Sequence, residues 1–380
     1  MRTKAGPLLI LAQAAGNMIA ELAEDAGSCA IFGTFHMKPL PLLPPTVTVH
    51  SAPPLCIDGT VGRLWSWFRY LVWAAAWVVR QPRNAHMLLF SNPPPLPILG
   101  YLLRKLTGRT YTVVVYDIYP DLLVRIGKLR KTGLIARLWR TANRLAYGAA
   151  DHVVTLGPCM VETLALQTTA PIVVIPPWVD TAAVRPVPKD QNPVAREYHQ
   201  TGKLTVMYMG KMGISHDMET MLAAAARLQD TPDVHFMFIG AGPKWDTVRR
   251  LAEGLSNVTL LPWQSERVPL FHAMADIATV SLEAVASGVE VPSRTVFAMA
   301  AGAAILAVSC PPNDLERLVG EHGCGCNVAL GDVDAFVGVI RRWAENSREL
   351  QACRKAARRA AEHAYSREVN AAKMLGLLRT

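Results

Sequence analysis

The chain has 380 residues, of which 51% are hydrophobic and 18% charged. This length and composition allow two domains with full cores and exclude an intrinsically disordered chain. Residues 1–150 hold 17 Lys and Arg against 6 Asp and Glu, a net charge of +11, whereas the remainder holds 22 against 24. We therefore expect the first part to face an anionic partner: a membrane surface, a phosphorylated substrate or a nucleic acid.

The beginning of the chain alternates short apolar runs with helical patterns. The apolar run 8–12 is shorter than the core of a signal peptide, usually ~7–15 residues, so a first β-strand is the better interpretation. Further strands are predicted at 29–35, 47–50, 87–90 and 110–116, and helices at 18–26, 96–106 and 134–146. This βαβ order predicts a parallel sheet.

Residues 64–79, LWSWFRYLVWAAAWVV, contain four of the nine tryptophans. Between Arg69 and Arg80 only ten residues are uncharged, against the ~20 that a membrane-spanning helix needs. Two interpretations compete: a buried packing helix of the first domain, or an interfacial helix with Trp at headgroup depth and Arg toward anionic lipid. A membrane span is the third alternative.

Two polar clusters follow in the first half. Asp117-Ile118-Tyr119-Pro120-Asp121 comes directly after the strand at 110–116. In open α/β sheets ligands bind outside the carboxyl ends of strands, so these carboxylates lie where chemistry is usually done. Lys128, Arg130 and Lys131 precede the helix 134–146 and form either a solvated loop or a contact for phosphate or lipid.

The second half repeats the α/β pattern. Residues 181–200 are polar and contain proline, which is typical of a linker. Strands are then predicted at 204–209, 234–239, 257–261, 277–280 and 303–308. We predict an α/β protein with two Rossmann-like domains whose parallel sheets face a central cleft. The expected parts are an N-terminal domain at 1–182, a linker at 183–200, a C-terminal domain at 201–362, and a C-terminal helix within 363–380 that packs back on the first domain.

The stretch 291–308, VPSRTVFAMAAGAAILAV, predicts a loop, a short helix, a glycine stop and a buried strand. Ser293 is expected to cap the helix, and Gly302 to end it. Arg294 in the first helical turn suits an anion such as a diphosphate, although most helix N-termini bind nothing.

A metal site and a disulfide framework are both disfavoured by the sequence. Asp332 and Asp334 form an Asp-x-Asp pair, which metal-dependent transferases use for Mg²⁺, but here it precedes a helix and is better explained as N-capping. The seven cysteines are odd in number and scattered, as expected for small buried residues in a reducing cytosol. We expect no metal and no cofactor.

A series of glycine-bearing and polar motifs resembles family 4 glycosyltransferases, which have the GT-B fold. In the second half these are Tyr208–Gly213, His216-Asp217, Phe238–Pro243, Asp276-Ile277, Pro292-Ser293-Arg294, Ala300-Ala301-Gly302, Gly323-Cys324-Gly325 and Gly331-Asp332. In the first half, Asp117–Asp121 and Ile175–Asp180 are similar to the branch that builds colanic-acid-type exopolysaccharides and O-antigens. Each motif is weak alone; their number, order and spacing make the set specific.

The resemblance implies a hexosyltransferase-type enzyme that transfers a sugar with retention and without metal. The donor would be a nucleotide-sugar, usually a UDP-sugar, and the acceptor a polyprenyl-diphosphate-linked glycan. The protein would be cytoplasmic, in peripheral contact with the anionic inner face of the plasma membrane. Nucleic acid is not expected as a partner, because no helix-turn-helix or RNA-binding motif is evident. The oligomeric state is left open.

The resemblance also implies roles for single residues. Departure of a nucleoside diphosphate builds negative charge, which needs fixed donors and cations. Lys211 and Arg294 would clamp the donor phosphates, and Asp117 would contact the acceptor hydroxyl as a general base. The other residues assigned to the donor are Gly210, Gly213, His216, Gly240, Gly242, Lys244, Glu290, Ser293 and Thr295.

The sequence departs from the family pattern in two places. Of the family's paired glutamates, the second falls at Phe297, and Glu290 lies near the first without matching its register. The glycine-rich loop after the first strand is reduced to Ala14-Ala15-Gly16-Asn17. Two alternatives therefore remain: a non-catalytic nucleotide-sugar-binding pseudoenzyme, and a nucleotide-sugar epimerase of the same fold.

Overall fold

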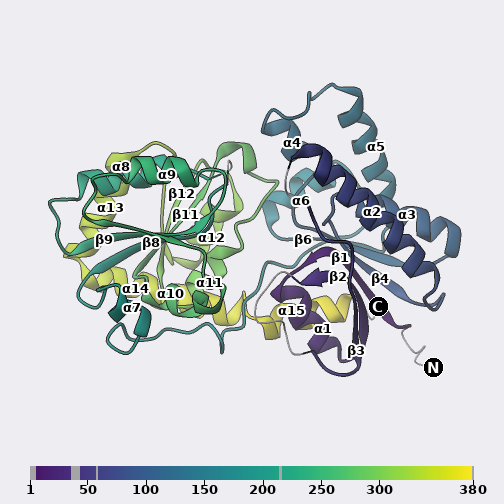
Figure 1. Cartoon of the computed structure of the whole chain (residues 1–380), viewed down its shortest axis with the longest axis horizontal. Coiled ribbons are helices and arrows are strands. Elements are labelled where there is room, and N and C mark those ends of the chain that lie inside the picture. Colours follow the sequence, from purple (N-terminus) through teal and green to yellow (C-terminus); the bar gives the residue numbers. More distant parts are fainter. Residues whose placement is uncertain (1–5, 36–42, 57–58, 214–215, 379–380) are drawn as a thin grey trace. The chain divides into compact units, whose positions relative to one another are not determined.

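The computed structural model describes residues 6–35, 43–56, 59–213 and 216–378. The chain divides into two compact units (Figure 1). Unit 1 contains Met1–Pro176, Gly288–Val291 and Asn370–Thr380, and unit 2 contains Pro177–Ser287 and Pro292–Val369. The first boundary thus falls at Pro176, and the chain re-enters unit 1 twice after leaving it.

Unit 1 is built on a seven-stranded parallel sheet with the order β3-β2-β1-β4-β5-β6-β7. Its strands are β1 (Leu8–Ala15), β2 (Cys29–Phe35), β3 (Val47–His50), β4 (His86–Phe90), β5 (Tyr111–Val115), β6 (His152–Thr155) and β7 (Ile172–Val174). The five predicted strands before residue 120 are all confirmed. Their β-branched and apolar runs suit a sheet covered on both faces.

The faces that the helices of unit 1 cover are set by the strand order, which reverses at β1. The helices are α1 (Asn17–Ala26), α2 (Thr60–Val79), α3 (Leu96–Thr107), α4 (Asp121–Arg125), α5 (Leu134–Gly148) and α6 (Pro158–Ala165). Parallel crossovers are right-handed, so α1 and the later helices cover opposite faces of the sheet. Helices α2, α3 and α5 lie side by side above one face, with α3 in contact with both neighbours (Figure 1).

The tryptophan-rich segment forms helix α2, which excludes the interpretation as a membrane span. None of the helices in the described ranges is long and apolar enough to cross a bilayer. The helix buries only every fourth residue, a narrow stripe formed by Ser66, Tyr70, Ala74 and Val78. Leu71 and Trp77 pack partly against the same core, whereas Trp65 and Trp73 are exposed, so α2 is not a fully buried packing helix either.

Unit 2 holds a six-stranded parallel sheet with the order β10-β9-β8-β11-β12-β13. Its strands are β8 (Leu204–Lys211), β9 (Val234–Ala241), β10 (Val258–Pro262), β11 (Ile277–Leu282), β12 (Ala304–Ser309) and β13 (Gly325–Val328). Its helices are α7 (Pro193–Glu197), α8 (Glu219–Arg227), α9 (Trp245–Leu251), α10 (Val268–Met274), α11 (Arg294–Ala300), α12 (Asp314–His322), α13 (Val333–Glu345) and α14 (Ser347–His363). The final helix, α15 (Arg367–Leu377), lies largely in unit 1.

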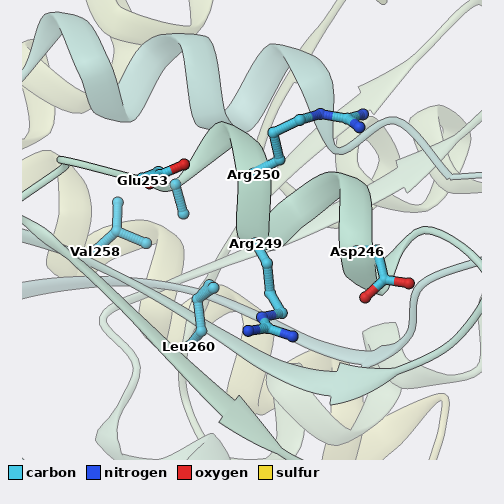
Figure 2. Close-up of a pocket in the computed structure, with 7 residues that line it drawn as sticks. Asp246, Arg249, Arg250, Glu253, Val258 and Leu260 are labelled. Carbon is cyan, nitrogen blue, oxygen red and sulfur yellow. The ribbon is translucent and has the colours of Figure 1, made fainter.

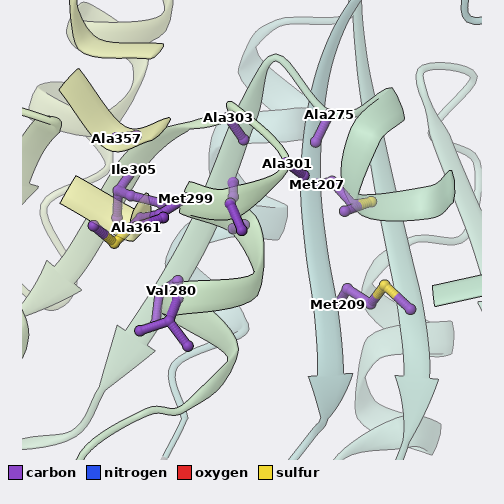
Figure 3. Packing of buried hydrophobic residues seen from close by; sticks show 14 of the residues in the cluster. Met207, Met209, Ala275, Val280, Met299, Ala301, Ala303, Ile305, Ala357 and Ala361 are labelled. Atoms are coloured by element: carbon purple, nitrogen blue, oxygen red, sulfur yellow. The ribbon is translucent and has the colours of Figure 1, made fainter. Parts of the chain in front are cut away.

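The core of unit 2 is continuous across its central strands. Met207 on β8, Val280 on β11 and Ile305 on β12 pack with Met299 on α11 and Ala361 on α14 (Figure 3). Strand β12 is fully buried between β11 and β13, as predicted for residues 303–308. Gly302 has φ 78°, the left-handed conformation expected of the glycine that ends α11.

Three local predictions differ from the structure. Residues 183–200 are not a linker: Val194 and Ala195 of α7 are buried in the core of unit 2, and Asn192 caps that helix. Ser293 makes no capping hydrogen bond, because its backbone (φ −60°, ψ −25°) is already helical, whereas an N-cap needs an extended residue. Helix α14 was not predicted at all.

The capping prediction for the Asp-x-Asp pair is confirmed. The Asp332 carboxylate accepts a hydrogen bond from the Ala335 N–H at 2.9 Å, at the beginning of α13. Asp334 forms an ion pair with Arg227 across to α8. Both carboxylates therefore have structural roles.

Candidate functional site

Two glycine loops in unit 2 approach so closely that side chains are excluded. A Cβ on Gly240, at the end of β9, would lie 1.9 Å from the carbonyl oxygen of Gly210, at the end of β8. A Cβ on Gly242 would lie 2.5 Å from the carbonyl oxygen of Met212. Gly210 and Gly242 also have φ of 140° and 146°, which side-chain-bearing residues rarely adopt. The loops therefore place backbone at the carboxyl ends of β8 and β9, and the strand order reverses beside β8, between β8 and β11.

Arg294 is held over the end of β8 by two aromatic residues. Its guanidinium lies 4.8 Å from the ring centroid of Tyr208 and donates a hydrogen bond to the Tyr208 hydroxyl. The hydroxyl in turn donates to the carbonyl of Lys211 at 2.8 Å. The second guanidinium nitrogen contacts Nε2 of His216. We call Tyr208, Gly210, Lys211, His216 and Arg294 the Arg294 cluster.

Both ring nitrogens of His216 face hydrogen-bond donors, although a neutral imidazole can accept at only one of them. The Gly213 N–H points at Nδ1 from 3.2 Å, and the Arg294 guanidinium, which has no acceptor, points at Nε2. A neutral imidazole has one N–H and one lone pair, so whichever nitrogen carries the proton, one of the two contacts joins two donors. An oxyanion between them would satisfy both, because it only accepts.

Electrostatics keep His216 neutral. Burial lowers its pKa to about 2, and the charges of Arg294, Lys244 and Lys211 add to this effect. Lys244 is paired with Glu219 and Glu283, so Arg294 and Lys211 are the cations left to offer positive charge beside a ring that itself carries none. Such a site attracts an anion without having to expel a proton first.

The two lysines assigned to the donor have different surroundings. Lys211 is exposed, and within the described residues its ammonium has no hydrogen-bond or ion-pair partner. Lys244 donates to the carbonyl of His216 at 2.7 Å and to Glu219 at 3.1 Å, and it lies 3.8 Å from Glu283. Lys244 therefore braces the loop that carries His216, and the phosphate contact assigned to it stays a prediction.

The two acidic residues around Lys244 were not assigned from sequence. Burial raises the pKa of Glu283, Asp217 and Glu219 add to the rise, and Lys244 opposes it. Tyr208 was part of the motif Tyr208–Gly213 but received no role, because a tyrosine within a strand looks like a core residue in the sequence.

At the beginning of α11, the assignment of the backbone amides of residues 293–295 to the donor phosphates stays a prediction. Ser293 is exposed, and the Thr295 hydroxyl is buried and donates to the carbonyl of Pro292 at 2.8 Å. Helix α11 has only seven residues, so its dipole is small. Arg294 is thus the functional group that this segment contributes.

Phe297 lies on α11, three residues after Arg294. Its ring stacks on that of His272, with centroids 6.0 Å apart and planes at 28°. Burial, with a smaller contribution from Arg294, lowers the pKa of His272 to about 4, so this ring is also neutral at pH 7. At the position of the family's second glutamate, this chain therefore presents an aromatic pair.

A second cluster of site residues belongs to unit 1. Asp117 follows β5, as predicted, and is half-buried. Burial raises the pKa of Tyr119, the negative charges of Asp117 and Glu290 add to the rise, and Arg63 of α2 opposes it. Asp117 and Glu290 thus lie around the same phenol at the carboxyl end of the sheet.

Glu290 belongs to a segment that packs in unit 1, and its assignment to the donor stays a prediction. The segment Gly288–Val291 packs in unit 1: the Ile118 N–H donates to the Val289 carbonyl at 3.2 Å, and the Thr163 hydroxyl to the Gly288 carbonyl at 2.9 Å. Within unit 1 Glu290 groups with Asp117 around Tyr119. Its sequence distance from Arg294, only four residues, gave no sign of this.

A surface cavity of about 600 Å³ lies elsewhere in unit 2 (Figure 2). It is lined by α9 and β10, with Arg249, Arg250, Asp246 and Glu253 around an apolar floor of Val258 and Leu260. None of the predicted site residues lines it. We therefore base the site on the Arg294 cluster.

Segments of both units match known protein families. Residues 12–178 match the family described as "Glycosyl transferase 4-like domain", and residues 203–346 match "Glycosyl transferases group 1". "Probable glycosyltransferase WbjE" of Pseudomonas aeruginosa is 30% identical over 72% of this chain and 69% of its own length. WcaI of Escherichia coli K12, named for glycosyl transfer in colanic acid biosynthesis, is 24% identical over 78% of this chain and 83% of its own.

Solved structures show the same fold. HepE of Anabaena, in complex with UDP and glucose, superposes with a TM-score of 0.72 over 98% of this chain and 99% of its own, at 14% identity. Its likeness identifies the two parallel-sheet units as the GT-B fold. Together with the two family matches and the relationship to WbjE, this shows that the chain is a GT-B glycosyltransferase of family 4.

Proposed function

We propose that the enzyme transfers a sugar from a UDP-sugar to a polyprenyl-diphosphate-linked glycan, with retention and without a metal. The observation that carries the donor half of this proposal is the mismatch between His216 and Arg294, which a phosphate oxygen would resolve. The structure of HepE holds UDP as a ligand, which supports uridine as the base.

On the donor side, the diphosphate replaces the contact between Arg294 and His216. Its oxygens accept from the Arg294 guanidinium and from His216 Nε2–H, whose tautomer is fixed by the Gly213 N–H. Lys211 supplies a second positive charge from the end of β8. These fixed donors stabilise the negative charge that grows on the leaving nucleoside diphosphate, which is the work a bound Mg²⁺ would otherwise do.

On the acceptor side, Asp117 of unit 1 orients the acceptor hydroxyl and takes its proton as the bond to the sugar forms. The negative charges that act on Tyr119 mark this end of the sheet as acidic. A carboxylate there suits a neutral hydroxyl better than an anionic group. The diphosphate of the acceptor would then lie toward basic residues of unit 1 such as Arg63.

The nature of the acceptor is inferred from charge and from relatives. The name of WcaI refers to the biosynthesis of colanic acid, which is an exopolysaccharide. The net charge of +11 on residues 1–150 suits an anionic surface that carries a lipid-linked glycan. We therefore place the enzyme at the inner face of the plasma membrane, as a peripheral protein in exopolysaccharide or O-antigen synthesis.

Calorimetric titration with UDP and with GDP, each in the presence of EDTA, tests the donor half. Micromolar binding of UDP that EDTA leaves unchanged supports the proposal, and binding that needs added Mg²⁺ contradicts metal independence. Preference for GDP would reassign the base. Release of UDP from a UDP-sugar only when a polyprenyl-diphosphate-linked sugar is present then tests the acceptor half.

A further inference from the structure

Exposed apolar side chains gather on one side of unit 1. Among the described residues, seventeen large hydrophobic side chains are exposed, and thirteen of them lie on α2, α3 and α5. Unit 2 has two, Leu251 and Trp263. We call the outward side of these helices the three-helix face. Its exposed apolar residues are Val61, Leu64, Trp65, Phe68, Val72, Trp73, Val79, Leu102, Leu106, Leu134, Ile135, Leu138 and Leu145.

The spacing of these residues shows that the exposure belongs to whole helix surfaces. On α2, Trp65, Phe68 and Val72 recur at intervals of three and four, opposite the buried stripe that begins at Ser66. On α5, Leu134, Leu138 and Leu145 follow one stripe. Trp65 and Trp73 are each 60% exposed. An apolar surface of this extent on a folded unit marks an interaction site.

The same helices carry only positive charge. Helices α2, α3 and α5 together contain seven Lys and Arg and no Asp or Glu. Arg137 and Arg144 are exposed on α5 beside its leucines, and Lys105 is exposed next to Leu106 on α3. Lys128, Arg130 and Lys131 precede α5 and are exposed as well. The partner must therefore offer both an apolar layer and negative charge.

We propose that the three-helix face is the docking surface of this enzyme on an anionic lipid bilayer. Tryptophan and phenylalanine enter the headgroup and upper acyl region, while arginine and lysine contact lipid phosphates. This inference rests on the proposed lipid-linked acceptor, and it adds the surface and the helices through which the enzyme reaches that acceptor.

Two other occupants fit less well. A second copy of the chain, joined by a twofold axis, would place this face against itself and bring cations against cations with no acidic residue to pair them. A nucleic acid would pair the charges but leave the leucines and valines of α2 and α5 in water. A bilayer satisfies both the apolar and the basic residues.

The three-helix face is joined to the loop that carries Asp117. On α5, Arg140 binds Asp121 at 2.8 Å, and Asn143 donates to the carbonyl of Tyr119 at 2.7 Å. Trp139 stacks on the Tyr119 ring, with centroids 6.1 Å apart and planes at 12°. Docking of α5 on the bilayer therefore fixes the loop 117–121 relative to the membrane surface.

The test is flotation of the full chain with vesicles of phosphatidylcholine alone or with about 30% phosphatidylglycerol. We expect binding only to the anionic vesicles, and a loss with added salt. The variant Trp65→Ser/Trp73→Ser should bind at least about tenfold more weakly. Its matched control is Trp263→Ser, the exposed tryptophan of unit 2, which should bind as wild type does.

The contribution of the basic residues to vesicle binding is tested with a second variant and its matched control. Arg137→Glu/Arg144→Glu reverses two exposed charges seven residues apart on α5, and we expect at least about 25-fold weaker binding. Arg348→Glu/Lys355→Glu makes the same change at the same spacing on exposed positions of α14 in unit 2. The control should keep most of the binding although its net charge changes equally.

UDP titration of every variant separates this inference from the proposed function. If all variants bind UDP as wild type does and the α2 and α5 variants still float with anionic vesicles, the docking surface is wrong while the donor site stands. If vesicle binding follows the expectation but UDP does not bind, the proposed function fails and the docking surface stands. A wild-type dimer that Trp65→Ser/Trp73→Ser converts to a monomer would assign the face to a second copy and overturn the proposal.

Discussion

In unit 2 the Arg294 guanidinium faces Nε2 of His216. When Nδ1 accepts the hydrogen bond of the Gly213 N–H, Nε2 carries the proton, so two donors face each other. Arg294→Ala should weaken UDP binding by about tenfold to a hundredfold, as expected for the loss of charged hydrogen bonds. Calorimetry gives the change. Arg249→Ala, in the cavity beneath α9, is the matched control, and equal affinity of Arg294→Ala and wild type would remove Arg294 from the site.

Lys211 and Lys244 should differ when each is changed to alanine. Lys211 is exposed at the strand end, so its loss should weaken UDP binding by about fivefold to tenfold, more at low salt than at high salt. Lys244 is engaged with Glu219 and Glu283, so its loss should lower the melting temperature more than the affinity. A larger affinity loss for Lys244→Ala than for Lys211→Ala would reverse these two roles.

Gly240→Ala should destabilise unit 2 by about 3 kcal/mol, because its new Cβ would overlap the Gly210 carbonyl and separate two strand ends. Urea unfolding measures the change. Gly338→Ala is the control: this glycine is exposed within α13, and a Cβ there meets no atom within 4 Å, so alanine should stabilise by about 1 kcal/mol. Similar stabilities of the two variants would contradict the close approach.

Asp117→Asn should leave UDP binding unchanged and abolish sugar transfer, because the amide cannot take the hydroxyl proton. Asp180→Asn, a carboxylate that accepts from the backbone N–H of Ala182, is the control and should remain active. Full activity of Asp117→Asn in a coupled assay for UDP release would exclude Asp117 from the reaction.

The free energy of unfolding should decrease as the pH falls below about 6.5. His216 and His272, with pKa values lowered to about 2 and about 4, stay neutral in the folded enzyme and take up a proton only when the chain unfolds. Their stabilising contribution is complete above pH 6.5 and shrinks below it, by up to about 1.4 kcal/mol per pH unit for each.

His272→Phe isolates one of these two contributions. Phenylalanine preserves the aromatic contact with Phe297 and removes the buried Nδ1, which has no partner among the described residues. Urea unfolding between pH 7.5 and 5.0 should show a smaller loss of stability than in wild type. The exposed His363→Gln should keep the wild-type slope, and an equal slope for His272→Phe would contradict the expectation.

Where a single physical signal dominated, the sequence predicted the structure. The apolar run after Gly302 became the buried strand β12, and the β-branched run before Asp117 became β5. Helix α14 was missed because its buried face consists mainly of alanines such as Ala357 and Ala361, which give little apolar contrast. Its arginines made the segment look uniformly polar.

The site was harder to predict because its groups depend on contacts between segments far apart in the chain. Lys211 and Arg294 could be named from glycine-bearing motifs, and the structure places both at the end of β8 in unit 2. The partners of Lys244 and the position of Glu290 could not, because hydrogen bonds to Glu219 and packing against Ile118 leave no local pattern. Ser293 failed as a cap for a backbone reason that its residue type does not show.

The narrow buried stripe of α2 has a practical consequence. Because Ser66, Tyr70, Ala74 and Val78, with the partly buried Leu71 and Trp77, anchor the helix, its exposed aromatics Trp65, Phe68 and Trp73 can be replaced by polar residues without disturbing the sheet beneath. A chain resurfaced in this way should remain folded and should associate less through this face at the high concentrations that crystallisation requires. The same redesign would yield a catalyst for detergent-free synthesis on water-soluble acceptor analogues.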